Sequence, residues 1–166
     1  MTLGRLNALS AADAEAELLA CCGSRRWARE MAARRPFADV AALLAAADEV
    51  WWALGPDDWH EAFRAHPRIG ERKAAPAQGA RAASWSAQEQ AGAAGDDVAA
   101  ALAEGNRAYE ERFGHIYIVC ATGKTADEML AILRARLAND AATELRAAAA
   151  EQAKITRLRL EKLLAG

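Results

Sequence analysis

The segment "HIYIVCAT", His115–Thr122, is the only stretch of the 166-residue sequence with the composition of a β-strand. It is rich in β-branched and aromatic residues, whereas the apolar residues elsewhere recur at helical spacing. One strand cannot form a sheet, because its backbone N–H and C=O groups need a neighbouring strand. The sequence therefore predicts an all-α fold with one short extended segment threaded through it.

The sequence on either side predicts about eight to nine helices, with start and stop signals at most of their ends. The predicted helices follow Ser10, Ser24, Pro36, Gly55, Ser86, Thr125 and Asp140, and the one from Ser86 breaks around Gly92–Gly95 and ends near Arg112. The Gly/Ala/Pro/Arg stretch "IGERKAAPAQGARAA", Ile69–Ala83, is interpreted as a loop. A chain of this length can bury a core without crosslinks, so we expect a single domain over residues 1–166.

Composition favours a soluble, cytoplasmic globular protein. The net charge of −2 and the pI near 6.0 argue against nucleic acid or an anionic membrane as a partner. Cys21, Cys22 and Cys120 form no C-x-x-C pair, which favours a reducing compartment over disulfides or a thiolate zinc site. There is no apolar run of membrane-spanning length, and the N-terminus turns acidic where a signal peptide would turn apolar.

Two motifs that suggest other functions are rejected on their spacing. "ATGKTADE", Ala121–Glu128, ends like a phosphate-binding loop, but such a loop needs a glycine five residues before Gly123, where Ile118 stands. "HEAFRAH" imitates a zinc-binding helix, but His60 and His66 are separated by about 600° of helical rotation and lie on opposed faces. Neither a nucleotide site nor a metal site is therefore expected.

His66, in "AFRAHPRIGE", Ala62–Glu71, is the first candidate for chemistry. Trp59, Phe63 and His66 follow i, i+4 and i+7, so the ring shares the apolar face of the helix that begins at Pro56. Pro67 disfavours helical geometry at His66, which places the imidazole at the C-terminal end of this helix. That position favours the imidazolium form and suits a proton donor near neutral pH. A buried histidine that only caps the helix is the alternative.

The turn "WSAQEQAG", Trp85–Gly92, is the second candidate. Ser86 and Glu89 have the spacing of a capping box, in which each side chain binds the other's backbone amide at a helix start. The same N-terminal amides also attract anions, so the turn is alternatively a substrate-binding site. Gln90 adds an amide that can both donate and accept hydrogen bonds.

Arg159, on the last predicted helix, is the third candidate. With Ile155 at zero, Arg159 falls at about 40°, inside the arc of apolar residues, whereas Arg157 falls at about 200°, outside it. A guanidinium directed into a core needs a carboxylate partner, from the protein or from a ligand. An acid–base, a carboxylate and a carboxylate binder are the groups needed for a cofactor-free reaction on a small anion.

Four stretches carry a resemblance to a known family: "HPRIGE", "WSAQEQAG", "YEERFGHIYIVCATGKTADEML" and "RLANDAATELRAAAAEQAKITRLRLEKLL". In this order and spacing they closely resemble the 2-oxo-4-hydroxy-4-carboxy-5-ureidoimidazoline (OHCU) decarboxylases of urate degradation. The resemblance covers nearly the whole chain, except that the region up to Trp52 matches only in its helical character. It implies an all-α homodimer that forms (S)-allantoin and CO₂ without a metal or an organic cofactor.

The resemblance also implies roles for residues that match the family's motifs. His66 would be the catalytic acid–base, with Glu89 as its catalytic partner. The implied substrate-binding residues are Pro67, Ser86, Gln90, Ile118, Val119, Cys120, Ala121, Thr122 and Arg159. Residues 118–122 would form a backbone wall around the substrate ring.

Two other classes of protein remain as alternatives to this enzyme. A non-catalytic helical binding module would keep the same helix caps and apolar stripes but would show no turnover. A metal-dependent hydrolase would need a set of ligands that the sequence does not supply at a usable spacing.

Overall fold

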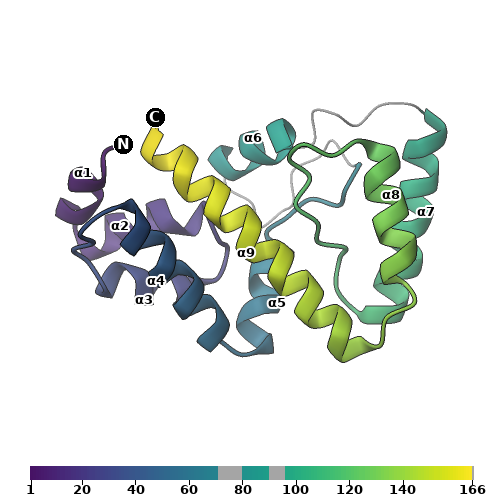
Figure 1. Cartoon of the computed structure of the whole chain (residues 1–166), viewed down its shortest axis with the longest axis horizontal. Coiled ribbons are helices and arrows are strands. Elements are labelled where there is room, and N and C mark those ends of the chain that lie inside the picture. Colours follow the sequence, from purple (N-terminus) through teal and green to yellow (C-terminus); the bar gives the residue numbers. More distant parts are fainter. Residues whose placement is uncertain (71–79, 90–95, 166) are drawn as a thin grey trace. The chain divides into compact units, whose positions relative to one another are not determined.

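The computed structural model describes residues 1–70, 80–89 and 96–165, and the regular elements within them are all α-helices (Figure 1). The nine helices of these residues are α1 Leu3–Ala8, α2 Ala11–Leu19, α3 Arg25–Ala33, α4 Val40–Ala53, α5 Pro56–Arg64, α6 Ala80–Glu89, α7 Asp96–Phe113, α8 Ala126–Arg136 and α9 Ala141–Ala165. The all-α fold and the expected number of helices are confirmed.

The predicted helix starts are correct where a polar side chain caps the helix. The hydroxyl groups of Ser10 and Ser24 accept hydrogen bonds from amides three residues later, at 3.1 and 3.2 Å. Thr125 and Glu128 form a complete capping box at the start of α8. A carboxylate oxygen of Asp140 accepts from the amide of Thr143 at 2.7 Å, in the first turn of α9. Each of these bonds satisfies an amide that has no partner within its own helix.

The start of α6 differs from the prediction. The helix begins at Ala80 and ends at Glu89, so it occupies part of the stretch that was interpreted as a loop. The residues "ARAASW" before Ser86 are mostly strong helix formers, and this propensity outweighs the capping signal at Ser86. The predicted break around Gly92–Gly95 lies outside the described residues.

Two differences concern the N-terminal region. Helix α1, capped by Thr2, is not among the predicted helices, because its six residues are too few to show a hydrophobic period. The sequence predicts that the helix after Ser10 runs through Cys21 and Cys22 and stops at Gly23, but α2 ends at Leu19. The amides of Cys21 and Cys22 instead both bind the carbonyl of Leu18, in a turn that closes the helix.

The described chain forms two compact units, of which the first comprises Met1–Ala62 and Ala153–Gly166. Within it α2 packs on α3, and α3 packs on α4. Its core contains the buried indoles of Trp27 and Trp51. The indole N–H of Trp27 donates to the carbonyl of Ala47, and that of Trp59 donates to the carbonyl of Trp51, at 3.2 and 3.0 Å. The polar edges of these large side chains are thus satisfied inside the core.

The second unit comprises Phe63–Gln152, and α7 and α8 lie side by side in it (Figure 1). Its core residues are Ile69, Leu102, Tyr109, Tyr117, Val119, Ala121, Ala126, Met129, Leu130 and Leu133. The two helices approach closely at Gly105, where an added Cβ would lie 2.5 Å from a terminal methyl carbon of Leu133. Glycine is therefore the residue that permits this contact.

The predicted extended segment joins α7 to α8 in the second unit, and residues 117–121 are buried. Side chains rather than a neighbouring strand bind its backbone. A guanidinium nitrogen of Arg136 donates to the carbonyl of Ile118 at 2.6 Å, and the amide of Cys120 donates to a carboxylate oxygen of Glu151 at 3.0 Å. The ammonium of Lys124 donates to the carbonyl of Cys120 at 2.7 Å. This arrangement explains how a lone extended segment is stable in a helical protein.

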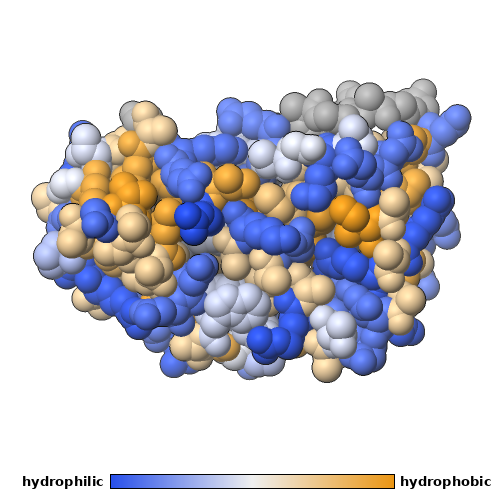
Figure 2. Space-filling model, viewed as in Figure 1, coloured by the Kyte–Doolittle hydropathy of each residue, from blue (hydrophilic) through white to orange (hydrophobic). Residues whose placement is uncertain are grey.

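Hydrophobic patches lie between hydrophilic ones on the face shown in Figure 2. The exposed large hydrophobic residues of the described chain include Leu19, Val40 and Trp52. None of the helices in the described ranges has both the length and the hydrophobicity needed to cross a membrane.

Candidate active site

His66 lies just beyond the last turn of α5, as the sequence predicts. Its amide donates to the carbonyl of Phe63 at 3.1 Å, which closes the helix, and Pro67 follows in a non-helical conformation. Trp59, Phe63 and Pro67 are buried, whereas His66 is half-buried. The ring is thus fixed at a helix end and is partly open to solvent, as a proton-transfer group requires.

Gln152, on α9, contacts the ring of His66. The side-chain oxygen Oε1 of Gln152 lies 2.6 Å from Nε2 of His66, and Gln152 is fully buried. Sequence reasoning did not identify this residue. A signal was available, because the helical phase that places Arg159 inside the apolar arc of α9 places Gln152 there too, at about 60°.

The residue before Gln152 on α9, Glu151, binds the predicted wall. Glu151 accepts the hydrogen bond from the amide of Cys120, so consecutive residues of one helix bind the extended segment and the imidazole. Burial raises the pKa of the Cys120 thiol, and this effect outweighs the hydrogen bond with the Thr122 backbone and the charge of Lys124, which lower it.

Ser86 and Glu89 lie on the last turns of α6, so the predicted capping box at a helix start is wrong. Within the described residues, the amides of Ser86 and Glu89 are therefore not those of a helix start. Ser86 is 4% exposed and Glu89 is half-buried. Gln90 lies outside the described residues.

The remaining wall residues differ in exposure. Ile118, Val119, Cys120 and Ala121 are buried, whereas Thr122 is exposed. Within the second unit, neighbouring residues of α9 contact His66 and the wall, Gln152 the imidazole and Glu151 the amide of Cys120.

Arg159 belongs to the first unit and has the predicted helical phase. It is 3% exposed, and one of its guanidinium nitrogens donates to the carbonyl of Ala20 at 3.2 Å. Arg157 is exposed and pairs with Glu161 at 3.5 Å. Burial raises the pKa of Cys22 to about 12, while the nearby charge of Arg159 lowers it by less. The thiol therefore stays neutral at physiological pH.

A buried charge network around Arg136 supports the wall, because Arg136 also binds the carbonyl of Ile118. The sequence did not predict this network. Arg136 binds Glu144 through Nε at 2.9 Å, and the hydroxyl group of Tyr109 donates to Glu144. Burial alone would lower the pKa of Arg136, but the hydrogen bond and charge of Glu144 outweigh it and raise the pKa. Burial raises the pKa of Tyr109, and Glu144 raises it further. Arg136 therefore stays charged and Tyr109 stays protonated as a donor.

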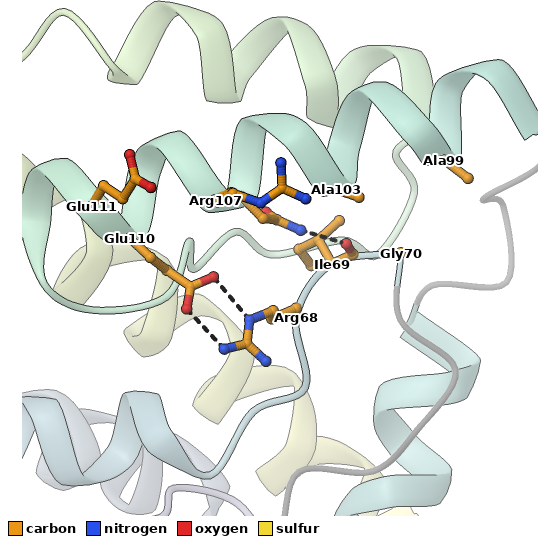
Figure 3. A pocket seen from close by; sticks show the side chains of 9 residues that line it. Arg68, Ile69, Gly70, Ala99, Ala103, Arg107, Glu110 and Glu111 are labelled. Carbon is orange, nitrogen blue, oxygen red and sulfur yellow. Dashed lines mark hydrogen bonds and ion pairs between the residues drawn. The ribbon is translucent and has the colours of Figure 1, made fainter.

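A pocket of about 550 Å³ lies next to the turn that follows Pro67 (Figure 3). Arg68 lines it and binds Glu110 of α7 with two hydrogen bonds, of 2.8 and 2.9 Å. Asn106, which is buried, donates to the carbonyl of Ile69 at 2.9 Å. The site residues predicted within the described chain do not line this pocket. The hydrogen bonds of its lining residues hold the turn after His66 against α7.

Comparison with known proteins gives one consistent result. The model of the OHCU decarboxylase family matches residues 7–161. The uric acid degradation bifunctional protein TTL of Arabidopsis thaliana is 41% identical over 153 residues, which cover 90% of this chain and 47% of that protein. The 2-oxo-4-hydroxy-4-carboxy-5-ureidoimidazoline decarboxylase of Amia calva is 36% identical over 135 residues, or 78% of this chain and 75% of that protein.

A solved structure is also similar. It is a crystal structure of OHCU decarboxylase in the presence of (S)-allantoin, with a TM-score of 0.79 and 36% identity. The match covers 90% of this chain and 98% of the other. The chain therefore spans about half of the bifunctional plant protein but nearly all of the crystallised one.

Proposed function

Because the chain belongs to the OHCU decarboxylase family, we propose that it converts 2-oxo-4-hydroxy-4-carboxy-5-ureidoimidazoline to (S)-allantoin and CO₂. The observation that carries the proposal is the family match over residues 7–161, and the position of His66 at the end of α5, with its ring against Gln152, supports it. A non-catalytic binding module would not need a fixed, partly exposed imidazole.

The substrate itself can accept the electron pair that remains when CO₂ leaves. Its carboxylate is attached to a ring carbon that also bears a hydroxyl group and adjoins unsaturated ring atoms. When the bond to the carboxylate breaks, CO₂ leaves and the electron pair passes into the ring. A proton then returns to one face of the ring carbon. In this mechanism the chain's own residues move the protons, and no metal or organic cofactor takes part.

His66 is the catalytic acid–base of the proposal. It moves a proton at the substrate hydroxyl, and Glu89 orients or polarises the imidazole or the substrate. The half-buried position of both residues supports these roles, because electrostatic interactions are stronger in a partly desolvated site.

The binding residues of the proposal are those of the family resemblance. Residues 118–122, with Pro67, Ser86 and Gln90, contact the ring and the ureido group. Arg159 binds the carboxylate, and its burial supports this role, because a buried guanidinium suits bidentate binding of a carboxylate. We further propose that the chain acts as one domain over residues 1–166, that it is a cytoplasmic homodimer, and that neither nucleic acid nor membrane is its partner.

The proposed activity is tested with freshly generated ureidoimidazoline, by following the circular dichroism of (S)-allantoin as it appears. We expect a rate well above that of the spontaneous reaction. A rate equal to the spontaneous one would contradict the proposal and favour the binding module.

The variant His66→Asn separates catalysis from helix capping. Asn is tolerated at a helix end, so the fold should persist, while the loss of a general acid–base should lower kcat by roughly 10²–10⁴-fold. Far-ultraviolet circular dichroism checks the helical content of the variant. Activity within about threefold of the wild type would make His66 a structural residue.

A further inference from the structure

The contact between Gln152 and His66 has a definite chemical polarity. The atom of Gln152 that faces the ring at 2.6 Å is the amide oxygen, which can only accept a hydrogen bond. Nε2 of His66 must therefore be the donor. In the neutral imidazole only one nitrogen carries hydrogen, so the lone pair then lies on Nδ1.

We propose that Gln152 is a positioning residue, which holds His66 in the Nε2–H form so that Nδ1 is the atom that exchanges a proton with the substrate. The inference rests on the proposed function for its catalytic part, whereas the protonation state of the ring is a property of the protein alone.

The surroundings of Gln152 make it suited to this task. It is fully buried on α9, with Ala148 and Ala149 buried before it and Ile155 buried after it. An amide held in such packing keeps its orientation without a charge. The preceding residue, Glu151, binds the wall at Cys120. One turn of α9 therefore holds both the imidazole and the wall in place. Such fixed geometry is what proton transfer to a bound substrate requires.

A neutral partner also matters to the chemistry. A carboxylate beside Nε2 would favour the imidazolium form and raise the pH at which the ring loses its charge. An amide accepts from both the neutral and the charged ring. Gln152 thus fixes the orientation of the ring without favouring its charged form as a carboxylate would.

The first test is nitrogen-15 magnetic resonance of the histidine rings in the wild-type protein without substrate. The signals of His66 are those that disappear in His66→Asn. Above the pH at which this ring titrates, we expect a protonated Nε2 and an unprotonated Nδ1. A ring protonated at Nδ1 would overturn the inference, whether or not the protein is a decarboxylase.

The second test uses the variants Gln152→Met and Gln152→Glu. In Gln152→Met the ring loses its acceptor, and we expect kcat to fall by about tenfold to a hundredfold with little change in KM. In Gln152→Glu we expect the pH profile of kcat to move upward by about one unit or more, because an adjacent carboxylate stabilises the imidazolium.

The wild type and the two Gln152 variants share every other charged and titratable group on the elements that carry the site. These groups include Arg64, Arg68 with its partner Glu110, Glu89, His115, Lys124 and Glu151. A shift of the profile is therefore due to residue 152. Lys154→Met, on the exposed side of α9, is the matched control and should leave both kcat and the profile unchanged.

The outcomes separate the inference from the proposed function. If the wild type shows no turnover, the function fails, and the resonance experiment still decides the inference. If the wild type is active while Gln152→Met keeps its kcat and Gln152→Glu keeps its pH profile, the positioning role of Gln152 is wrong.

Discussion

At the scale of single residues, two arginines two positions apart on α9 have opposite environments. Arg159 is buried and donates to a backbone carbonyl, whereas Arg157 is exposed and paired with Glu161. The helical phase predicted this difference, because a period of about 3.6 residues separates the two side chains by about 200°. The helical phase therefore predicts which charged residue is buried, but it does not predict which group that residue binds.

Conservative substitution of the two arginines tests the proposed carboxylate site. Arg159→Lys should raise KM or lower kcat by an amount on the order of 1.5–3 kcal/mol, because a lysine cannot form the two parallel hydrogen bonds of a guanidinium. Arg157→Lys should cost at most about 1 kcal/mol, because its ion pair is exposed. Steady-state kinetics on both variants measures the difference. A larger effect at Arg157 would contradict the assignment of Arg159.

The same helical phase could have identified more of the site than it did. Glu144, Glu151 and Gln152 all fall inside the apolar arc of α9, at about 340°, 320° and 60° from Ile155, and they bind Tyr109, Cys120 and His66. Their partners could not be predicted, because those lie 31 to 86 residues away in sequence and only the folded chain brings them together.

At the scale of elements, α8 and α9 hold the extended segment through a buried ion pair. Arg136 links Glu144 to the carbonyl of Ile118, so the pair serves the wall as well as the two helices. A buried charge that loses its partner is far more costly than an exposed one, because neither water nor another charge compensates it.

Removal of one charge from this pair should destabilise the protein strongly. Glu144→Gln keeps the volume but leaves Arg136 charged and buried, and it should lower the free energy of unfolding by about 3–5 kcal/mol. Glu104→Gln breaks the exposed pair with Arg107, so it should cost at most about 1 kcal/mol. Urea denaturation of both variants measures the difference. Equal losses would mean that the buried pair contributes no more than the exposed one.

Helix α6 illustrates where prediction from short motifs fails. The pattern Ser86-x-x-Glu89 satisfies the capping rule, yet both residues lie at the end of the helix. A local signal of about 1 kcal/mol was outweighed by the summed propensity of the residues before it. Caps were predicted correctly where a non-helical stretch precedes them, as at Ser24 and Thr125.

At the scale of the whole molecule, the all-α fold class could be predicted because the sequence offers no second strand with which a sheet could form. The only β-like segment had no partner strand in the sequence, and the described structure satisfies its backbone with side chains instead. The division of the described chain into two compact units was not predicted, because it depends on long-range packing that no local pattern records.

The proposed reaction makes a prediction for the whole enzyme. Because the substrate ring accepts the electron pair, activity should persist after exhaustive treatment with a chelator and dialysis. The rate of (S)-allantoin formation before and after treatment measures this. Activity that disappears and returns only with a specific divalent metal would contradict the cofactor-free mechanism.

The dependence of the extended segment on later side chains has a consequence for synthesis. Its backbone leaves the ribosome before Arg136 and Glu151 have been made, so the carbonyl of Ile118 and the amide of Cys120 lack their eventual partners at that time. In a β-hairpin, by contrast, the backbone hydrogen bonds can form as soon as the second strand leaves the ribosome. Here the carbonyl of Ile118 gains its partner only when the end of α8 has been made, and the amide of Cys120 only when α9 has been made, so the backbone of this segment is completed late in synthesis.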